Sequence, residues 1–374
     1  MRTTDTRMSD HTGSDILVIG GGVIGLMTAR ELAATGASVT LVEMGDTGQQ
    51  ASWAGGGILS PLYPWRFAGA VTALATWSQR VYPALCTELF ESTGIDPEYN
   101  TSGLMILDPE EHAEARAWAS AEQQTLTTLN PTQIHELEPG LQTEVREALW
   151  LEDIGQVRNP RLTKALRVAI EPEVSIREHE EVLELRVKDG VVQGVRTRAG
   201  DIAAKRVVIC TGAWTAELLG KLGRKPDIYP VRGQMILFYA KPGQIRHLTL
   251  YRERYVIPRR DGRVLLGSTL ENAGFEKRTT AEAKEELYRI ATELFPLLKR
   301  TPIEDHWAGL RPGSPSGIPY IGPYPGGEGL YVNAGHFRNG LVTGPASARL
   351  LADLLLGRDP ILPASAYALD AARG

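Results

Sequence analysis

The sequence lacks the features that mark several common classes of protein. Its 374 residues include only two cysteines, Cys86 and Cys210, which lie far apart and form no C-x-x-C pair. We therefore expect both to be reduced and buried. The seven histidines form no H-x-x-x-H pair, so no metal site is predicted. The formal net charge is −5, and a broad basic surface for nucleic acid is not expected.

Long hydrophobic runs and targeting signals are also missing. The apolar run at residues 16–19 is far too short to span a bilayer. Residues 1–14 are polar and lack the apolar centre of a signal peptide, so we expect a disordered leader, with Met8 as an alternative start. A cytoplasmic location and no membrane partner follow by default. The length and the 43% hydrophobic content suit a soluble globular protein with two domains.

The most informative segment that is present runs from Asp15 to Glu43. The apolar run 16–19 is typical of a buried parallel strand, and a helical pattern follows from Val23 to about Ala34. A second β-branched run at 39–42 is followed by Glu43. The segment therefore predicts a βαβ unit of the kind that binds dinucleotides.

Three glycines at the first turn of this unit form G-x-G-x-x-G. Gly20 permits the tight turn, Gly22 lets the backbone approach a pyrophosphate, and Gly25 lets helix and strand pack closely. The helix N-terminus offers free N–H groups to the phosphates. Glu43 lies where a carboxylate accepts hydrogen bonds from ribose hydroxyls. An ADP-containing cofactor is predicted, either NAD or FAD.

Two other segments suit the same cofactor. The loop after Glu43 carries Gly55, Gly56 and Gly57, and its apolar residues favour a cofactor-lining loop over a flexible surface loop. The run 206–214 predicts a second buried strand that ends in Thr211–Gly212. That ending is equally typical of backbone beside a nucleotide and of a plain strand-to-helix turn.

The C-terminal region distinguishes FAD from NAD. A strand at 330–333 runs into Gly335, a polar loop and Gly340, and a helix follows to about Leu356. This arrangement aims a second helix N-terminus at the far end of the cofactor. Reduced flavin carries negative charge there that N–H groups stabilise, whereas a nicotinamide does not. The alternative is an ordinary C-terminal helix.

The order of these elements predicts an α/β protein of two domains. A Rossmann-like FAD-binding domain is expected from the discontinuous pieces 14–80, 140–224 and 308–374. A second, antiparallel-sheet domain for substrate is expected from 81–139 and 225–307. A ligand is expected at their junction.

Finer patterns predict individual elements. Residues 70–93 have helical periodicity, and the charged, alanine-rich residues 110–129 predict a surface helix. Residues 174–198 alternate apolar and polar around a turn at Asp189–Gly190, as antiparallel strands do.

Five motifs together resemble one flavoenzyme superfamily. They are GGGVIG, ASWAGGGILSPLYPWR, PVRGQ, WAGLRPGSPSGIPYIG and GHFRNG. The chain from Asp15 to about Gly357 is similar to the D-amino-acid oxidase superfamily and, within it, to the bacterial glycine oxidases of thiamine biosynthesis. The resemblance implies non-covalent FAD, a D-amino-acid oxidase-like fold and a homo-oligomer, often a tetramer. It also implies an amino-acid substrate and O₂ as reaction partners.

The resemblance assigns substrate binding and catalysis to three residues. Arg311 of WAGLRP is expected to bind the substrate carboxylate, with Arg338 of GHFRNG nearby and the Tyr255 hydroxyl on the same group. A guanidinium presents paired donors that match a carboxylate, which a lysine does not. Taken singly, each arginine also fits a surface salt bridge, and the tyrosine fits a strand aromatic half in the core.

The resemblance also assigns the cofactor contacts. The first βα turn is expected to contact the pyrophosphate, and Glu43 the adenosine ribose. Val182 is expected to contact the adenine, and Thr211–Gly212 to flank the ADP part. The second loop approaches the flavin or its ribityl chain, and the C-terminal turn borders the isoalloxazine. The full set is Gly20, Gly22, Val23, Ile24, Gly25, Glu43, Ser52, Gly55, Gly56, Gly57, Val182, Thr211, Gly212, Gly335, Asn339, Gly340, Leu341, Val342 and Thr343.

The activity implied is FAD-dependent oxidative deamination. The substrates expected are glycine, N-substituted glycines (sarcosine-like or bulkier N-carboxymethyl amines) and small D-amino acids. The residues position the substrate for hydride transfer to flavin N5, and O₂ becomes H₂O₂. Tyr63, Trp65 and Arg66 fit an entrance or a contact to an N-substituent, and the role of His336 stays open.

Three other functions fit parts of the sequence. An oxidase domain acting on a carboxymethyl group of tRNA would need an excess of basic residues for phosphate, which the net charge of −5 does not offer. A sarcosine-oxidase type with covalent flavin would need a thiol after Cys210, and none follows. A non-catalytic FAD-binding protein is the third.

Overall fold

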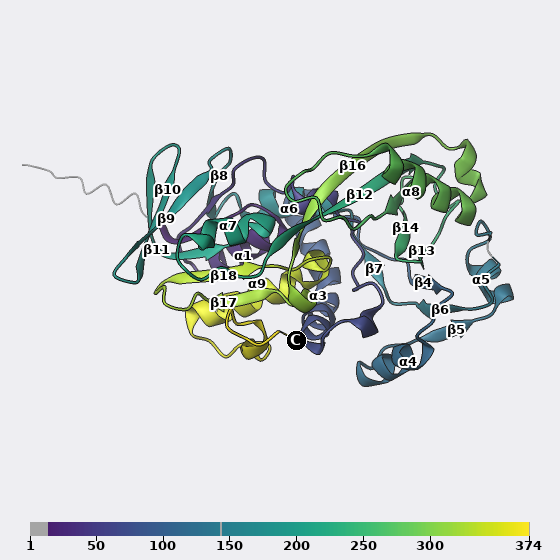
Figure 1. Ribbon diagram of the computed structural model, residues 1–374, viewed down its shortest axis with the longest axis horizontal. Coiled ribbons are helices and arrows are strands. Elements are labelled where there is room, and N and C mark those ends of the chain that lie inside the picture. Colours follow the sequence, from purple (N-terminus) through teal and green to yellow (C-terminus); the bar gives the residue numbers. More distant parts are fainter. Residues whose placement is uncertain (1–13, 143, 374) are drawn as a thin grey trace, which may run out of the picture.

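The structure is a computed structural model that describes residues 14–142 and 144–373. Two eight-stranded sheets lie towards opposite ends of an elongated molecule (Figure 1). Helices cover each sheet, and the segments that join the sheets pass through the middle of the molecule (Figure 1). The predicted α/β fold with a Rossmann-like sheet and a second sheet is confirmed.

The first sheet carries the dinucleotide turn. Its strand order is β17-β18-β11-β1-β2-β8, and β9 and β10 extend it as a hairpin beside β11. Strands β18, β11, β1, β2 and β8 run parallel, and β17 is antiparallel to β18. The bounds are β1 (Ser14–Ile19), β2 (Val39–Val42), β8 (Val174–Arg177), β9 (Val182–Lys188), β10 (Val191–Thr197), β11 (Asp201–Ile209), β17 (Tyr320–Pro323) and β18 (Leu330–Ala334).

Side chains of β1 enter two separate apolar cores because successive residues of a strand point to opposite faces. Ile16 and Val18 pack into the core formed with the helices, and Leu17 and Ile19 pack into the core on the other face. A strand buried on both faces reads as an unbroken apolar run, as this one does. The helices of the first sheet are α1 (Val23–Ala33), α3 (Gly69–Thr93), α6 (Asn159–Ile170), α7 (Thr215–Gly220) and α9 (Gly340–Leu356).

The second sheet carries two of the residues expected to meet substrate, Tyr255 and Arg311. Its order is β16-β12-β15-β14-β13-β4-β6-β5, antiparallel except for the parallel pair of β13 and β4. The strands are β4 (Leu104–Leu107), β5 (Thr127–Leu129), β6 (Ala148–Leu151), β12 (Tyr229–Tyr239), β13 (Leu248–Tyr251), β14 (Arg254–Pro258), β15 (Arg263–Gly267) and β16 (Ile303–Gly313). Its helices are α4 (His112–Ala121), α5 (Pro131–Leu137) and α8 (Ala281–Leu294).

Short elements complete the described chain. The helix α2 (Ala51–Ala54) lies in the loop after β2, and β3 (Asn100–Thr101) pairs with β7 (Gly155–Gln156). Five 3₁₀ turns are η1 (Pro64–Arg66), η2 (Gly212–Trp214), η3 (Pro296–Arg300), η4 (Pro315–Gly317) and η5 (Ala364–Tyr367).

Two of the finer expectations are wrong. The segment 174–198 is not uniformly antiparallel, because β8 pairs with β2 in parallel and only β9 and β10 form the hairpin. The segment 110–129 is not one helix, because α4 ends at Ala121 and β5 joins the second sheet. In both cases the neighbouring strand, which the local pattern does not contain, decides the structure.

The predicted domain boundaries stay a prediction. Strands of the second sheet do not follow them throughout. β6 falls in the predicted piece 140–224 yet pairs with β4 and β5, and β16 crosses the predicted boundary at 307/308 while paired with β12. The expected leader, 1–14, lies outside the described residues except for Ser14, which begins β1.

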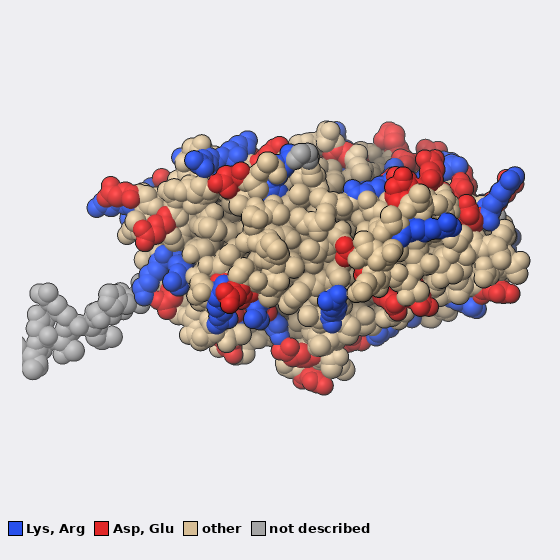
Figure 2. All heavy atoms as spheres, turned by 90° about the horizontal axis from the view of Figure 1, so that it is seen from below, with Lys and Arg blue, Asp and Glu red and all other residues tan. Residues whose placement is uncertain are grey.

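The described surface mixes charges of both signs. On the face in Figure 2, Lys and Arg are interspersed with Asp and Glu around the rim, and the middle is largely uncharged. Among the helices of residues 14–142 and 144–373, none combines the length and apolar character needed to cross a membrane.

The first βα turn is packed too closely for any side chain at its third glycine. A Cβ added to Gly25 would lie 1.8 Å from the carbonyl oxygen of Gly20. Gly20 itself has φ +103°, a conformation that favours glycine. The contact of β1 with the start of α1 therefore depends on a bare backbone.

We predict that Gly25→Ala destabilises the protein by about 1–3 kcal/mol and weakens cofactor binding, because α1 must move away from β1. Urea unfolding of the apoprotein and its flavin affinity measure both effects. Gly69→Ala is the control, since nothing lies within 4 Å of a Cβ at this residue in the first turn of α3. Equal behaviour of the two variants would contradict the prediction.

Candidate active site

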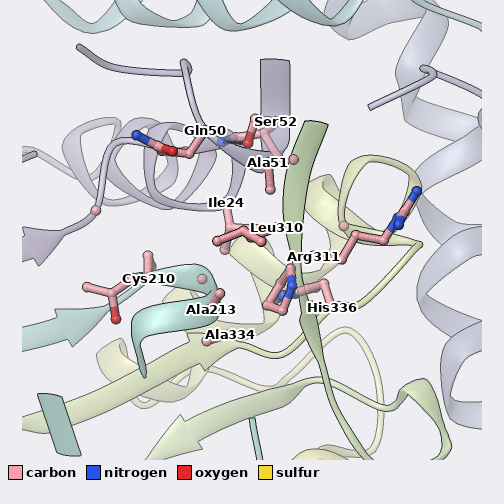
Figure 3. A pocket seen from close by; sticks show the side chains of 18 of the residues that line it. Ile24, Gln50, Ala51, Ser52, Cys210, Ala213, Leu310, Arg311, Ala334 and His336 are labelled. Carbon is pink, nitrogen blue, oxygen red and sulfur yellow. Dashed lines mark hydrogen bonds between the residues drawn. The ribbon is translucent and has the colours of Figure 1, made fainter. Parts of the chain in front are cut away.

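One elongated cavity of about 520 Å³ runs between the two sheets. Its walls come from the β1–α1 turn, the end of β2, the loop around α2, the end of β11, strands β14 and β16, and the turn after β18. In Figure 3 the side chains of Ile24, Gln50, Ser52, Arg311 and His336 surround it from these separate elements. It lies at the carboxyl ends of the parallel strands, where open α/β sheets bind ligands.

The α1 end of the cavity is built from backbone. Gly20 and Gly22 line it, and the Val23 N–H donates to the hydroxyl of Ser52 at 2.9 Å. The first turn of a helix leaves N–H groups without partners inside the helix, and these attract phosphate oxygens. The β1–α1 turn and the segment around Ser52 therefore meet at the expected pyrophosphate position.

Glu43 directly follows β2 and lines the same part of the cavity. Its carboxylate accepts hydrogen bonds from the Gly21 N–H at 2.7 Å and from the Gly45 N–H at 3.1 Å. These bonds fix a buried acid, 7% exposed, at the cavity wall. The Glu180 N–H donates to the Glu43 carbonyl oxygen at 2.9 Å, which brings the start of β9, with Val182, to the same end.

The glycine loop after α2 is held against its neighbours with no room for side chains. Gly57 has φ +82°, and a Cβ there would lie 2.0 Å from the Val157 carbonyl oxygen. Asn159 donates to the Ser52 carbonyl oxygen at 2.8 Å. The buried Arg259 donates to the carbonyl oxygens of Gly56 and Val157 at 2.7 and 2.8 Å. The backbone of the loop is therefore presented to the cavity in a fixed position.

Arg311 lies near the end of β16, at the opposite part of the cavity. Its guanidinium lies over Gly233 of β12, where a Cβ would be 2.0 Å from Nη1. It donates to the Thr269 carbonyl oxygen at 3.2 Å and to the Ser268 hydroxyl at 2.6 Å. Both partners are neutral, so the positive charge stays available to an anion.

Burial lowers the pKa of Arg311 below its ordinary value, and the nearby charge of Arg338 acts in the same direction. Tyr255 and Glu271 oppose this shift. Glu271 forms an ion pair with the buried Arg232 at 2.5 Å and accepts from the Thr269 hydroxyl. The loop whose carbonyl holds Arg311 is thus itself held by a charged pair.

Tyr255 of β14 lies between the glycine loop and Arg311. Its ring is 3.1 Å from a Cβ built on Gly56, and its hydroxyl is 3.8 Å from the Met235 sulfur. The residue is 7% exposed and lines the cavity. The phenol also interacts with the Arg311 guanidinium, so its hydroxyl lies next to the group expected to bind the substrate carboxylate.

The turn after β18 brings two further side chains to the same place. The Phe337 N–H donates to the Pro312 carbonyl oxygen at 2.8 Å, and the Ser314 hydroxyl donates to the Gly335 carbonyl oxygen at 2.6 Å. These bonds tie the turn to the end of β16, so Arg338 and His336 line the cavity beside Arg311. Burial lowers the pKa of His336 to about 3, so its imidazole is neutral.

The structure brings most of the predicted residues to the cavity wall. Those that line it are Gly20, Gly22, Val23, Ile24, Glu43, Ser52, Gly55, Gly56, Gly57, Val182, Thr211, Gly212, Tyr255, Arg311, Gly335, Arg338, Gly340 and Leu341. Gly25, Asn339, Val342 and Thr343 lie behind the wall. Gly25 packs on β1, and the other three are buried at the start of α9. The individual roles stay predictions.

Sequence reasoning missed the residues that support the wall. Asn159 and Arg259 hold the glycine loop through hydrogen bonds that span 107 and 203 residues. Trp214 and Lys221, after β11, also line the cavity. The only signal for Arg259 is its place one residue after β14, and no short motif marks the others.

The aromatic segment after the glycine loop lies outside the wall. Trp65 and Arg66 both donate to the carboxylate of Glu111, at 2.5 and 2.7 Å, and the Arg66 guanidinium stacks 3.9 Å from the Tyr63 ring. Tyr63, Trp65 and Arg66 therefore join the loop to the start of α4. Ile58, Ser60 and Leu62 of the same stretch reach the cavity.

Comparison with known proteins gives the family. Residues 15–354 match the family described as FAD dependent oxidoreductase. The chain belongs to this family. It is therefore an oxidoreductase that uses FAD.

Individual relatives agree with the family. The chain is 50% identical to a protein named glycine oxidase from Pseudomonas putida, over 94% of this chain and 97% of that one. Its fold matches the crystal structure of glycine oxidase from Geobacillus kaustophilus with a TM-score of 0.90 and 30% identity, covering 96% and 99% of the chains. It matches iminodiacetate oxidase from Chelativorans sp. BNC1 with a TM-score of 0.85 and 26% identity, covering 94% and 98%.

The cavity of this FAD dependent oxidoreductase fits the cofactor. Backbone lines it at the N-termini of α1 and α9, and the loop of Gly55, Gly56 and Gly57 also presents backbone to it. Among the described residues, the buried His336 Nε2 and Arg338 Nη2 atoms have no hydrogen-bond partner. Such atoms need a polar ligand. No group of ligands for a metal ion occurs in the described part of the chain.

We predict that stability falls as the pH falls from 6.5, partly because of His336. The unfolded chain binds a proton with a pKa near 6.5, and the folded chain resists it down to about 3. This histidine alone should cost about 1.7 kcal/mol between pH 6.5 and pH 5. Unfolding of the FAD-loaded protein against pH measures it.

His336→Gln removes this titration, so its stability should depend less on pH in that range. His179→Gln is the control, because the His179 side chain is 70% exposed. A His336→Gln curve parallel to that of the unchanged protein would count against the neutral buried imidazole.

Proposed function

We propose that the protein catalyses the oxidative deamination of glycine and N-substituted glycines, with small D-amino acids as further substrates. The observation that carries this proposal is the guanidinium of Arg311. It faces the cavity with two neutral hydrogen-bond partners and has the Tyr255 hydroxyl beside it. Relatives named glycine oxidase, two of them 50% identical, support the same reaction.

In this proposal Arg311 binds the substrate carboxylate through its paired N–H donors, and Tyr255 adds the hydroxyl. A carboxylate held at two points by planar donors keeps one orientation, so the substrate Cα–H is aimed in one direction. The rigid wall of Gly56 and Gly57 limits the space beside it. Catalysis by these residues is therefore positioning rather than proton transfer.

FAD held at this site would supply a hydride acceptor for the substrate and would return the electrons to O₂ as H₂O₂. The residues expected to hold it are Gly20, Gly22, Glu43, the glycine loop and the first residues of α9. Non-covalent attachment is part of the proposal. Of the two cysteines, Cys210 lines the cavity, and burial raises its pKa to about 12, so its thiol stays protonated.

The amine must be neutral when hydride leaves, because its lone pair drives the departure. His336 is neutral and sits at the cavity, but nothing around it makes it a base at ordinary pH. We propose that the substrate amine loses its proton to water before the substrate binds in the cavity. Water also hydrolyses the imine product.

Several finer expectations belong to the same proposal. The homo-oligomer, a tetramer in many members of the superfamily, stays a prediction, and so do the thiamine pathway and the cytoplasmic location. The tRNA oxidase and the non-catalytic protein are not favoured by the relatives. Peroxide release with a small amine would distinguish the proposed enzyme from both of these.

A peroxide-release panel tests the proposal. The FAD-loaded protein is mixed with glycine, sarcosine, D-alanine, D-proline and larger N-alkylglycines, and H₂O₂ is measured in air. Bleaching of the flavin absorption without O₂ reports hydride transfer directly. Glycine or sarcosine should give both signals. Silence with every amine would refute the proposed function.

We predict that Arg311→Ala lowers kcat/KM for glycine or sarcosine by about 100-fold or more, mostly through KM. The variant loses charge-assisted hydrogen bonds worth roughly 3 kcal/mol. FAD should stay bound, because the side chain faces the substrate end of the cavity. Arg311→Lys should recover only part of the loss, since an ammonium lacks the planar fork.

Arg300→Ala is the matched control for this prediction. Arg300 ends η3 on the surface and does not line the cavity, so its removal should leave the kinetics unchanged. Unchanged substrate affinity in Arg311→Ala would contradict the assignment of the carboxylate site.

A further inference from the structure

Arg338, unlike Arg311, has a carboxylate partner. Its Nη1 donates to Oε2 of Glu253 at 3.3 Å, and its side chain is 12% exposed. Among the described residues, its buried Nη2 atom has no hydrogen-bond partner. Two guanidinium groups therefore line the cavity. Arg338 forms an ion pair with a carboxylate of the protein, whereas Arg311 has neutral hydrogen-bond partners.

Glu253 is held from its other side by Arg66. The second carboxylate oxygen, Oε1, accepts from Nη1 of Arg66. Arg66 is fixed in turn by Glu111 and by stacking on the Tyr63 ring. We call the chain of ion pairs from Arg66 through Glu253 to Arg338 the Glu253 bridge. It gives the aromatic segment after the glycine loop a role at the substrate end of the cavity.

The backbone also fixes Glu253. Arg252 and Glu253 form the turn between β13 and β14, with φ +47° and +65°. The Glu253 N–H donates to the Tyr63 hydroxyl at 3.5 Å. Tyr255, two residues later, lines the cavity. The acid is thus anchored by both main chain and side chain next to the residues expected to bind substrate.

The charges at this end decide which substrates fit. A monocarboxylate neutralises Arg311, and Glu253 already neutralises much of Arg338. An amine with a second carboxylate on its nitrogen would have to displace Glu253 from Arg338 and would also be repelled by it. Glu253 is 39% exposed, so solvent screens part of this repulsion, but two like charges close together still oppose each other. Binding of a dianion is therefore disfavoured by a charge that belongs to the protein.

We propose that Glu253 determines substrate specificity, favouring glycine-type amines with one carboxylate over N-carboxymethyl amines with two. This inference rests on the proposed function, since it concerns the same carboxylate site. A protein of the same fold, 26% identical to this chain, is named iminodiacetate oxidase after an amine with two carboxylates. The Glu253 bridge is the feature that separates the two substrate classes in this chain.

The test compares Glu253→Gln with the unchanged holoenzyme. kcat/KM is measured for sarcosine, iminodiacetate and N-carbamoylmethylglycine, which has the size of iminodiacetate but a neutral amide. The ratio of iminodiacetate to sarcosine should rise at least tenfold in the variant. The ratio of the amide to sarcosine should change little, because charge and not volume is altered.

Two further variants make the result specific. Glu253→Asp keeps the charge and should keep the preference for monocarboxylates. Glu304→Gln removes a carboxylate that pairs with Arg263 on β15, away from the cavity, and should leave every ratio unchanged. Flavin content and the unfolding midpoint of each variant show whether it is folded.

Binding without turnover separates this inference from the proposed function. Methoxyacetate and oxydiacetate carry one and two carboxylates and lack the amine, so their dissociation constants come from the flavin absorption change alone. Glu253→Gln should improve the affinity for oxydiacetate relative to methoxyacetate at least tenfold. An unchanged ratio, or an equal change for the amide and the diacid, would overturn the role of Glu253. Failure of the unchanged enzyme to oxidise any amine refutes only the proposed function.

Discussion

Two guanidinium groups share one cavity, and the surrounding structure compensates for the cost of bringing them together. Arg311 and Arg338 line the same cavity. The charge of Arg338 disfavours the protonated form of Arg311, because both groups are removed from water. The protein answers the two charges differently. Arg338 receives a carboxylate from Glu253, whereas Arg311 receives a carbonyl and a hydroxyl. Because Arg311 has only neutral hydrogen-bond partners, its positive charge is available to a bound anion. Since Arg338 already has a carboxylate partner, the site suits a ligand with one negative charge.

That arrangement requires segments that lie far apart in the sequence to meet. The pairing of β12 with β16 sets Gly233 opposite Gly309 and clears the space in which the Arg311 side chain lies. The loop after β15 supplies Thr269 and is held by Glu271. The turn after β18 is bonded to the end of β16. Both sheets therefore contribute to the substrate end, and neither sheet alone forms the site.

The sequence predicts what is local and misses what is distant. The turn of Gly20 to Gly25 and the acid at Glu43 could be predicted because each depends on neighbours within about thirty residues. The PVRGQ and WAGLRP motifs could be recognised, but the reason for the glycine in the first, room for the arginine of the second, appears only in the folded chain. Arg259 could not be predicted, because its partner Gly56 is 203 residues away. β8 was misjudged for the same reason, since β2 decides its direction.

The neutrality of His336 follows from its burial in the same cavity. The imidazole is buried beside two guanidinium groups, and among the described residues its Nε2 has no partner that would stabilise a proton. Protonation would place a third positive charge in a space where Glu253 and one substrate carboxylate offset only two. Burial therefore keeps the ring neutral and lowers its pKa to about 3. A neutral ring at this position preserves a hydrogen-bonding group without adding a charge, so the site stays matched to a single anion.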